Sequence, residues 1–171
     1  MKKAVVVLLA VLLAVALTVH AQVNDIKQQP SCKYCGMDRM KFNHSRMLIE
    51  YDDGTSIGTC SIHCAAVELA LSIDKIPKAL MVGDFISKDL IDAEKAVWVV
   101  GGSKPGVMTG RPKWAFEKKD DAERFIKENG GSLSTFDEAV KMAYEDMYQD
   151  TKMIRERRAM KKKAGIEHMH K

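Results

Sequence analysis

All four cysteines of this chain lie in one short stretch, which constrains the fold more than any other feature. Cys32 and Cys35 are separated by two residues, and Cys60 and Cys64 by three. These two thiol pairs can meet only if the segment between them turns back on itself. Because thiolate is a soft ligand, such a cluster selects Cu(I), Zn(II) or iron–sulfur centres over hard cations. Met37 adds a thioether, which suits Cu(I) better than Zn(II).

The first residues predict export. Residues 1–3 carry two lysines, residues 4–19 form an apolar run without charge, and small residues at Val19 and Ala21 precede Gln22. These are the features of a secretory signal peptide. The alternative is an uncleaved membrane anchor, for which the apolar run is short. No cysteine lies at the cleavage point, so we expect a periplasmic protein without a lipid anchor.

Removal of residues 1–21 leaves 150 of the 171 residues and lowers the formal net charge from +4 to +2. This charge is too small to indicate nucleic acid as a partner. A chain of this length can form one domain, or two small halves, around a modest core.

The cysteines of an exported chain have three interpretations. Two disulfides and one metal site are equally open from composition alone. A thiol-disulfide oxidoreductase using Cys32 and Cys35 is the weakest of the three. In such enzymes the cysteine pair opens a helix, whereas here Gly36 follows the pair and Pro30 and Ser31 precede it. We therefore expect the first pair on a turn.

The segment between the two cysteine pairs predicts a β-hairpin. Apolar and polar residues alternate from residue 47 to 52, and Asp53 and Gly54 form a two-residue turn signal. Residues 55–59 then supply the returning strand, which brings Cys60 back beside the first pair.

A helix is expected to follow the hairpin. Ser61 is a suitable N-cap, Ile62 and Ile73 begin and end an apolar stripe at helical spacing, and Pro77 closes the segment. Cys64 falls in the first turn, where the helix dipole favours a thiolate. A cysteine turn, a hairpin and a helix that carries the last ligand form a treble-clef-like arrangement.

The second part of the chain predicts strands and a loop. Residues 79–87 and 96–100 are apolar and suit buried strands, and residues 101–106 form a loop by composition. The loop is not a phosphate-binding one, because no Gly-Lys-Ser/Thr follows. Met108 lies in this loop, where a methionine ordinarily fills a gap in the core.

The remaining residues predict two helices. Asp120 with Glu123, and Thr135 with Glu138, both have the spacing of a capping box. The second helix becomes basic beyond residue 149. A basic face is usually solvated, and otherwise contacts anionic lipid or a partner. The tail ends in His168, Met169 and His170, which are residue types that also bind copper.

The ordered series of motifs resembles the nitrous oxide reductase accessory protein family, NosL, over roughly residues 30–145. The resemblance begins with Cys-Lys-Tyr-Cys-Gly-Met and Thr-Cys-Ser-Ile-His-Cys, a pattern that is also similar to the metal-sensing TRASH module. It continues through five more segments, namely residues 92–101, 105–110, 114–116, 129–131 and 136–139.

This resemblance implies a copper-binding protein of the cell envelope that holds Cu(I) and transfers it to a cuproenzyme such as nitrous oxide reductase. It implies an α+β fold with two small ββαβ-like halves, the first treble-clef-like, followed by a C-terminal helix. It also makes Met108 a candidate copper ligand. The implied metal ligands are therefore Cys32, Cys35, Met37, Cys60, Cys64 and Met108. This chain differs from many family members in lacking a lipid-acceptor cysteine and in having both Cys60 and Cys64.

The expected organisation has four parts: a signal peptide (1–21), a cysteine-rich metal-binding half (30–78), a second α+β half (79–148) and a basic helical tail (149–171). No catalytic triad or paired carboxylates indicate an enzyme. The leading hypothesis is a non-enzymatic copper carrier whose partner is a recipient cuproenzyme, with a possible weak contact between the tail and a membrane surface. The alternatives are a structural zinc module closed by the four cysteines and the thiol-disulfide oxidoreductase.

We predict cleavage after Ala21. The charged start, the apolar run and the small residues at positions 19 and 21 are those that signal peptidase requires. Mass spectrometry of the exported protein should give Gln22 as the first residue. A mature protein that begins at Met1 would instead indicate a membrane-anchored form.

Overall fold

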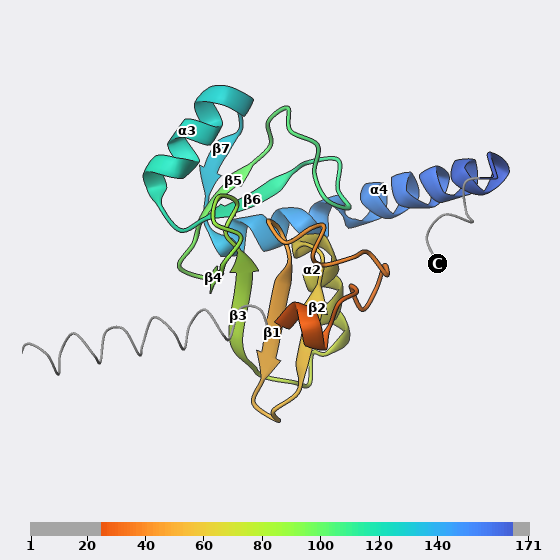
Figure 1. The fold of residues 1–171 in the computed structure, drawn as a ribbon, viewed down its shortest axis with the longest axis horizontal. Helices are drawn as coiled ribbons and strands as arrows, with labels where there is room; N and C mark the ends of the chain where they lie inside the picture. Colours follow the sequence, from red (N-terminus) through yellow and green to blue (C-terminus); the bar gives the residue numbers. More distant parts are fainter. Residues whose placement is uncertain (1–24, 166–171) are drawn as a thin grey trace, which may run out of the picture.

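Two ββαβ units, one after the other in the sequence, make up most of the structure (Figure 1). The structure is a computed structural model and describes residues 25–165. The predicted signal peptide and the tail residues His168 to His170 lie outside this range. Within it, no helix has both the length and the apolar composition needed to cross a membrane.

The first unit consists of β1 (Met47–Tyr51), β2 (Ser56–Thr59), α2 (Ile62–Leu71) and β3 (Pro77–Gly83), with β4 (Leu90–Asp92) added at the edge. All four strands pair antiparallel in the order β2-β1-β3-β4. β1 is buried except at Glu50, and it is an inner strand, paired with β2 on one side and with β3 on the other.

The predicted hairpin is confirmed, but its loop is longer than the turn signal indicates. Glu50 pairs with Ser56, and the Tyr51 N–H donates to the Thr55 carbonyl, which leaves three residues in the loop. Gly54 has φ +81°, the left-handed conformation that ends a three-residue hairpin loop.

The second unit consists of β5 (Val97–Val100), β6 (Lys113–Phe116), α3 (Lys119–Asn129) and β7 (Ser132–Ser134), and its strand order is β6-β5-β7. This order matches β2-β1-β3 of the first unit, so both units have the same topology. The α+β fold with two ββαβ halves is therefore confirmed.

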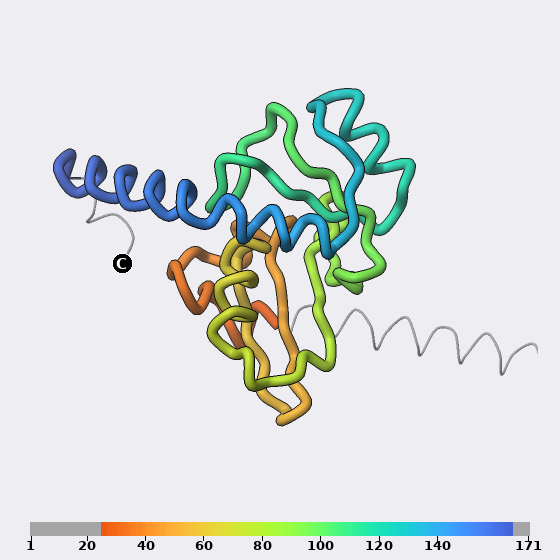
Figure 2. The backbone as a smooth tube through the Cα atoms, turned by 180° about the vertical axis from the view of Figure 1, so that it is seen from behind, coloured from red at the N-terminus to blue at the C-terminus, as the bar shows by residue number. Residues whose placement is uncertain are grey.

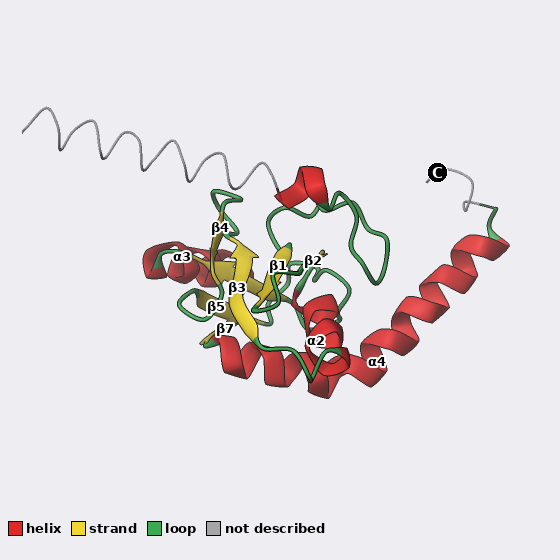
Figure 3. Cartoon of the chain, turned by 90° about the horizontal axis from the view of Figure 1, so that it is seen from below, coloured by secondary structure: helices red, strands yellow, loops and turns green. Residues whose placement is uncertain are grey.

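The long C-terminal helix α4 (Phe136–Lys163) follows the second unit and runs across both halves (Figure 2). The predicted capping box is present: the Glu138 N–H donates to the Thr135 hydroxyl, and the Glu138 carboxylate accepts from the Thr135 N–H. The last turns of α4 project beyond the body of the protein (Figure 3).

Two sequence expectations about helix ends are wrong. α2 ends at Leu71, so Ile73 lies outside the helix and is 89% exposed instead of continuing the buried stripe. α3 begins at Lys119, after the N-cap Lys118, so Asp120 is in the first turn and caps nothing. There a carboxylate still interacts favourably with the helix dipole. Ser61 is the N-cap of α2 as predicted, but its side chain makes no capping hydrogen bond.

The boundary expected after residue 78 falls inside β3, which pairs with β1 and β4 of the first sheet. We therefore propose that the first half extends to the end of β4 and that the second begins near Ala96.

Neither half forms a core alone, because both core clusters contain residues from both halves. The larger cluster joins Met47, Ile49 and Val82 of the first sheet to Trp98 of β5 and Phe136 of α4. The second cluster joins three of the cysteines to the second half: Cys32, Cys60, Cys64, Val99, Val107, Trp114, Phe116, Ala122 and Phe125. The cysteines are therefore packed where the two halves meet.

Two glycine pairs allow the chain to pass close to itself in the second half. A Cβ atom at Gly102 would lie 2.7 Å from the carbonyl oxygen of Asn129, and one at Gly131 would lie 3.0 Å from that of Gly101. All four glycines of these pairs, at positions 101, 102, 130 and 131, have positive φ. Gly101 and Gly102 thus allow this close backbone approach, which agrees with the sequence-based conclusion that residues 101–106 are not a phosphate-binding loop.

Candidate metal centre

The first cysteine pair lies on a tight turn, as its flanking residues predicted. The Gly36 N–H donates to the Cys32 carbonyl at 2.9 Å, and the Cys32 N–H donates to the Met37 carbonyl at 2.8 Å. Gly36 has φ +73°, which a residue with a side chain adopts only with strain. This turn holds Cys32 and Cys35 close together, and we call residues 30–39 the knuckle.

The second cysteine pair comes from the end of the hairpin and the start of α2. Cys60 directly follows β2, and Cys64 is the third residue of α2. The Ser45 hydroxyl donates to the Cys60 carbonyl at 2.9 Å and fixes this corner of the chain. The hairpin and helix therefore bring the second pair back to the knuckle, in a treble-clef-like arrangement.

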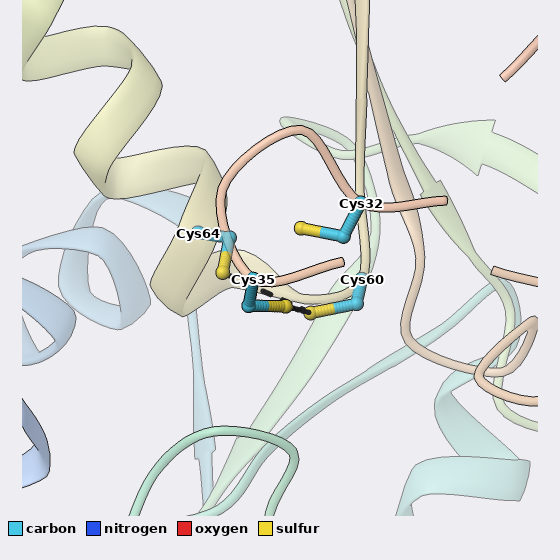
Figure 4. Close-up of side chains that lie close together, drawn as sticks. All are labelled: Cys32, Cys35, Cys60 and Cys64. Carbon is cyan, nitrogen blue, oxygen red and sulfur yellow. Dashed lines mark hydrogen bonds between the residues drawn. The ribbon is translucent and has the colours of Figure 1, made fainter. Parts of the chain in front are cut away.

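The four sulfur atoms converge on one point (Figure 4). All lie within 4.8 Å of one another, with Cys35 Sγ 3.4 Å from Cys60 Sγ and Cys60 Sγ 3.8 Å from Cys64 Sγ. In a tetrahedral site with metal–sulfur bonds of about 2.3 Å, sulfur atoms lie about 3.8 Å apart. All four cysteines are free thiols. Their arrangement thus fits one metal ion better than two disulfides.

The thiols influence one another's protonation. Hydrogen bonds from its three cysteine neighbours lower the pKa of Cys32, while hydrogen bonding to Cys32 raises the pKa of Cys60 and of Cys64. Cys64 lies in the first turn of α2, where the helix dipole favours a thiolate, while its three cysteine neighbours favour the protonated form. A full set of thiolates therefore needs a bound cation to compensate its charge.

A buried carboxylate fastens the knuckle to α2. Glu68 is 1% exposed and accepts hydrogen bonds from Lys33 and Tyr34, the two residues between the first cysteines. It also accepts from Tyr51 at 3.0 Å and Ser72 at 2.8 Å. Burial raises the pKa of Glu68, but these donors outweigh burial and lower it to about 2. The carboxylate thus stays ionised and holds the knuckle against the helix that carries Cys64.

A second buried ionic network fastens the knuckle to the hairpin. Arg39 is fully buried, and its guanidinium lies 2.7 Å from the Asp25 carboxylate and donates to the carbonyls of Met47 and Thr59. Arg46 bonds the same carboxylate at 3.1 Å. Because these charges are paired and hydrogen-bonded, they fix the knuckle from its other end.

The two candidate methionines lie in the same apolar cluster as the cysteines. Met37 and Met108 are both half-buried and pack against this cluster. Met108 lies in the β5–β6 loop and has φ +62°, which is uncommon for a residue with a side chain. Residues held in such conformations cluster at binding sites. The structure therefore places both methionines against the cluster that contains the cysteines, and their role as ligands stays a proposal.

Asp150 of α4 connects the Met108 loop with the helix that carries Cys64. Its Oδ1 accepts from the Gly110 N–H at 2.8 Å, and its Oδ2 lies 3.4 Å from Nδ1 of His63. Both side chains are buried, and within residues 25–165 these two facing atoms form no hydrogen bond. One residue of α4 thus contacts both the loop and the helix.

Together, the two ββαβ halves and the four converging thiols define an α+β metal-binding protein. The NosL family profile matches residues 22–144, and the chain belongs to this family. The family resemblance and the expectation of a protein that is not an enzyme are therefore confirmed.

Two known proteins are similar to this chain. The crystal structure of the copper chaperone NosL from Shewanella denitrificans matches with a TM-score of 0.52 and 27% identity, over 64% of this chain and 89% of that one. The HTH-type transcriptional repressor CutR of Bacillus subtilis is 31% identical over 121 residues. That match covers 71% of this chain and 60% of CutR, so the chain spans less than two thirds of this relative.

The residues that support the site are less evident in the sequence than its ligands. Glu68 follows Cys64 by four residues and lies on the same face of the helix. A charged residue on this buried face is a sequence signal that could have indicated a supporting role for Glu68. Asp150 and His63 carry no such signal, because their contact joins two elements that are distant in sequence.

We predict that Glu68→Gln lowers the free energy of unfolding by about 3 kcal/mol at neutral pH, because four donors lose a buried negative charge. The pKa of Glu68 is lower in the folded state, so its contribution is present above about pH 4.3 and is lost as the pH falls toward 2. Urea denaturation at pH 7 and at pH 2 measures this loss. The free energy of unfolding should fall less between these two pH values in the variant than in wild type. Glu50→Gln, at an exposed position of β1, is the matched control. Equal stability of the two variants at pH 7 would contradict the role of Glu68.

Proposed function

We propose that this protein is an exported Cu(I) carrier of the periplasm that delivers copper to a cuproenzyme such as nitrous oxide reductase. The observation that carries the proposal is the cluster of four free thiols in a chain of the NosL family. The similar Shewanella structure is described as a copper chaperone. The charged and apolar start of the sequence supports export.

In this proposal, the thiolates of the first half bind Cu(I), Met37 offers a thioether beside them, and Met108 closes over the metal from the second half. A carrier must release its cargo, and a neutral thioether holds Cu(I) with less negative charge than a further thiolate. The loop of Met108, flanked by Gly106 and Gly110, can move more readily than a strand.

A structural zinc site is the second candidate, because four sulfurs in near-tetrahedral spacing can also close around Zn(II). In that case Cys32, Cys35, Cys60 and Cys64 would be the complete ligand set, and neither methionine would contribute. A thiol-disulfide oxidoreductase is not favoured, because Cys32 and Cys35 lie on a turn beside two further thiols.

We predict that the reduced protein binds one Cu(I) and binds it more tightly than Zn(II), since its donors are soft. The affinity should rise with pH, because the thiols must lose protons to bind metal. Anaerobic competition with copper and zinc chelators measures both. Stronger binding of Zn(II) than of Cu(I) would favour the structural zinc site.

The same competition should show weaker Cu(I) binding in Cys35→Ser, Cys60→Ser and Cys64→Ser, because each variant removes one soft donor. Serine keeps the size of the side chain, so circular dichroism can confirm that the fold persists. Wild-type copper affinity in all three variants would place the metal elsewhere.

We predict that Met108→Leu weakens Cu(I) binding by about tenfold, a small loss for a change at a metal site. Leucine keeps the bulk and apolarity of methionine but lacks sulfur, so the protein should remain folded. Met40→Leu is the control, because Met40 is 57% exposed and lies outside the cysteine cluster. Equal copper affinity of Met108→Leu and wild type would show that the first half holds the metal alone.

A further inference from the structure

The last turns of α4 carry a strong positive charge. Residues 152–163, which we call the basic end of α4, contain seven cations and one acidic residue, Glu156. The cations are Lys152, Arg155, Arg157, Arg158, Lys161, Lys162 and Lys163. Within residues 25–165, none of them forms an ion pair.

Packing and helix electrostatics do not account for this charge. The last buried residue of α4 is Asp150, and every residue from Arg155 to Lys163 is exposed. Like charges at helical spacing repel one another. The helix dipole favours cations only in the last turn, which explains Lys161 to Lys163 but not the three arginines. The basic end also lies beyond the region matched by the family profile.

One residue of the basic end contacts the metal centre. The Arg158 guanidinium donates to the carbonyl oxygen of Cys35 at 3.3 Å. Cys35 is half-buried, whereas Cys32, Cys60 and Cys64 are at most 3% exposed. The basic end therefore borders the candidate metal centre beside its most accessible ligand.

We propose that the basic end of α4 is a docking surface for an acidic partner protein, and that Arg158 couples docking to copper release. The proposal rests on the copper-carrier function and names the chemistry of the partner. A carboxylate forms a charge-assisted, bidentate pair with arginine, which is stronger than a single hydrogen bond to a neutral carbonyl. An Asp or Glu of the partner can thus pair with Arg158 in place of the Cys35 carbonyl. This loosens the knuckle at the point where a copper-binding side chain of the partner would approach the metal.

The composition of the basic end favours a protein surface over a lipid surface. A helix that lies in a membrane interface needs an apolar face with large side chains opposite its cations. In the basic end, Met160 is the one large apolar side chain that is exposed, at 61%, while Met153 and Ile154 are half-buried. The cations are also distributed around the helix, since their spacing follows no single face.

The test uses Cu(I)-loaded protein, a polyglutamate peptide without copper ligands and an uncharged Cu(I) chelator. In wild type, saturating peptide should speed the loss of Cu(I) to the chelator by about fivefold, the factor that corresponds to one lost hydrogen bond. Arg158→Gln should release Cu(I) at about that faster rate without peptide and should not respond to it. Arg157→Gln loses the same charge but has no bond to the knuckle. It should therefore show the same acceleration at saturating peptide, but a higher peptide concentration should be needed to reach saturation.

The outcomes separate this proposal from the copper-carrier function. All three proteins should bind one Cu(I), and failure of wild type to do so would overturn the carrier function itself. If copper is bound, equal responses of Arg158→Gln and wild type to the peptide would overturn the coupling. Binding to phosphatidylglycerol vesicles without any effect of polyglutamate would assign the basic end to a membrane surface and also overturn the proposal. A polyglutamine peptide is the control for crowding and should change none of the rates.

Discussion

The packing of the two ββαβ halves against each other is the constraint on which the rest of the structure depends. Each half has a sheet of three or four short strands and one helix, which is too little to enclose a core. Trp98 of the second half therefore packs with Met47 and Ile49 of the first. The same packing places Cys60 and Cys64 in one apolar cluster with residues of β5 and β6, and Met108 packs against this cluster. The candidate metal centre thus lies where the halves meet.

Buried charges hold the centre in place from both sides. Glu68 ties the knuckle to α2, and Arg39 with Asp25 ties it to the hairpin. Buried ions are costly unless they are paired and hydrogen-bonded, and here each has several partners. The four thiols are consequently held together by protein contacts as well as by any metal. A preorganised site of this kind leaves less chain ordering to oppose metal binding.

Helix α4 gives the protein a marked separation of charge. Its first part carries Asp146 and Asp150, which bond Arg111, Lys113 and the Met108 loop. Its basic end projects from the body (Figure 1). Arg158 in this end donates to the Cys35 carbonyl of the knuckle. One helix therefore contacts the knuckle of the first half and the Met108 loop of the second. This arrangement gives a physical route by which a partner bound to the helix can affect the candidate metal centre.

The sequence by itself determined the candidate ligands and the local elements. The cysteine spacing, the alternation in the hairpin and the capping box at Thr135 are local signals, and the structure confirms the elements that they predict. Helix ends were less certain: Ile73 continued the apolar spacing but lies outside α2, because the chain turns away to begin β3. Only the tertiary structure revealed Glu68 as an anchor of the knuckle, and the contacts of Asp150 and Arg158 with segments far away in sequence. Such contacts depend on how whole elements pack in space, and no spacing along the chain records that packing.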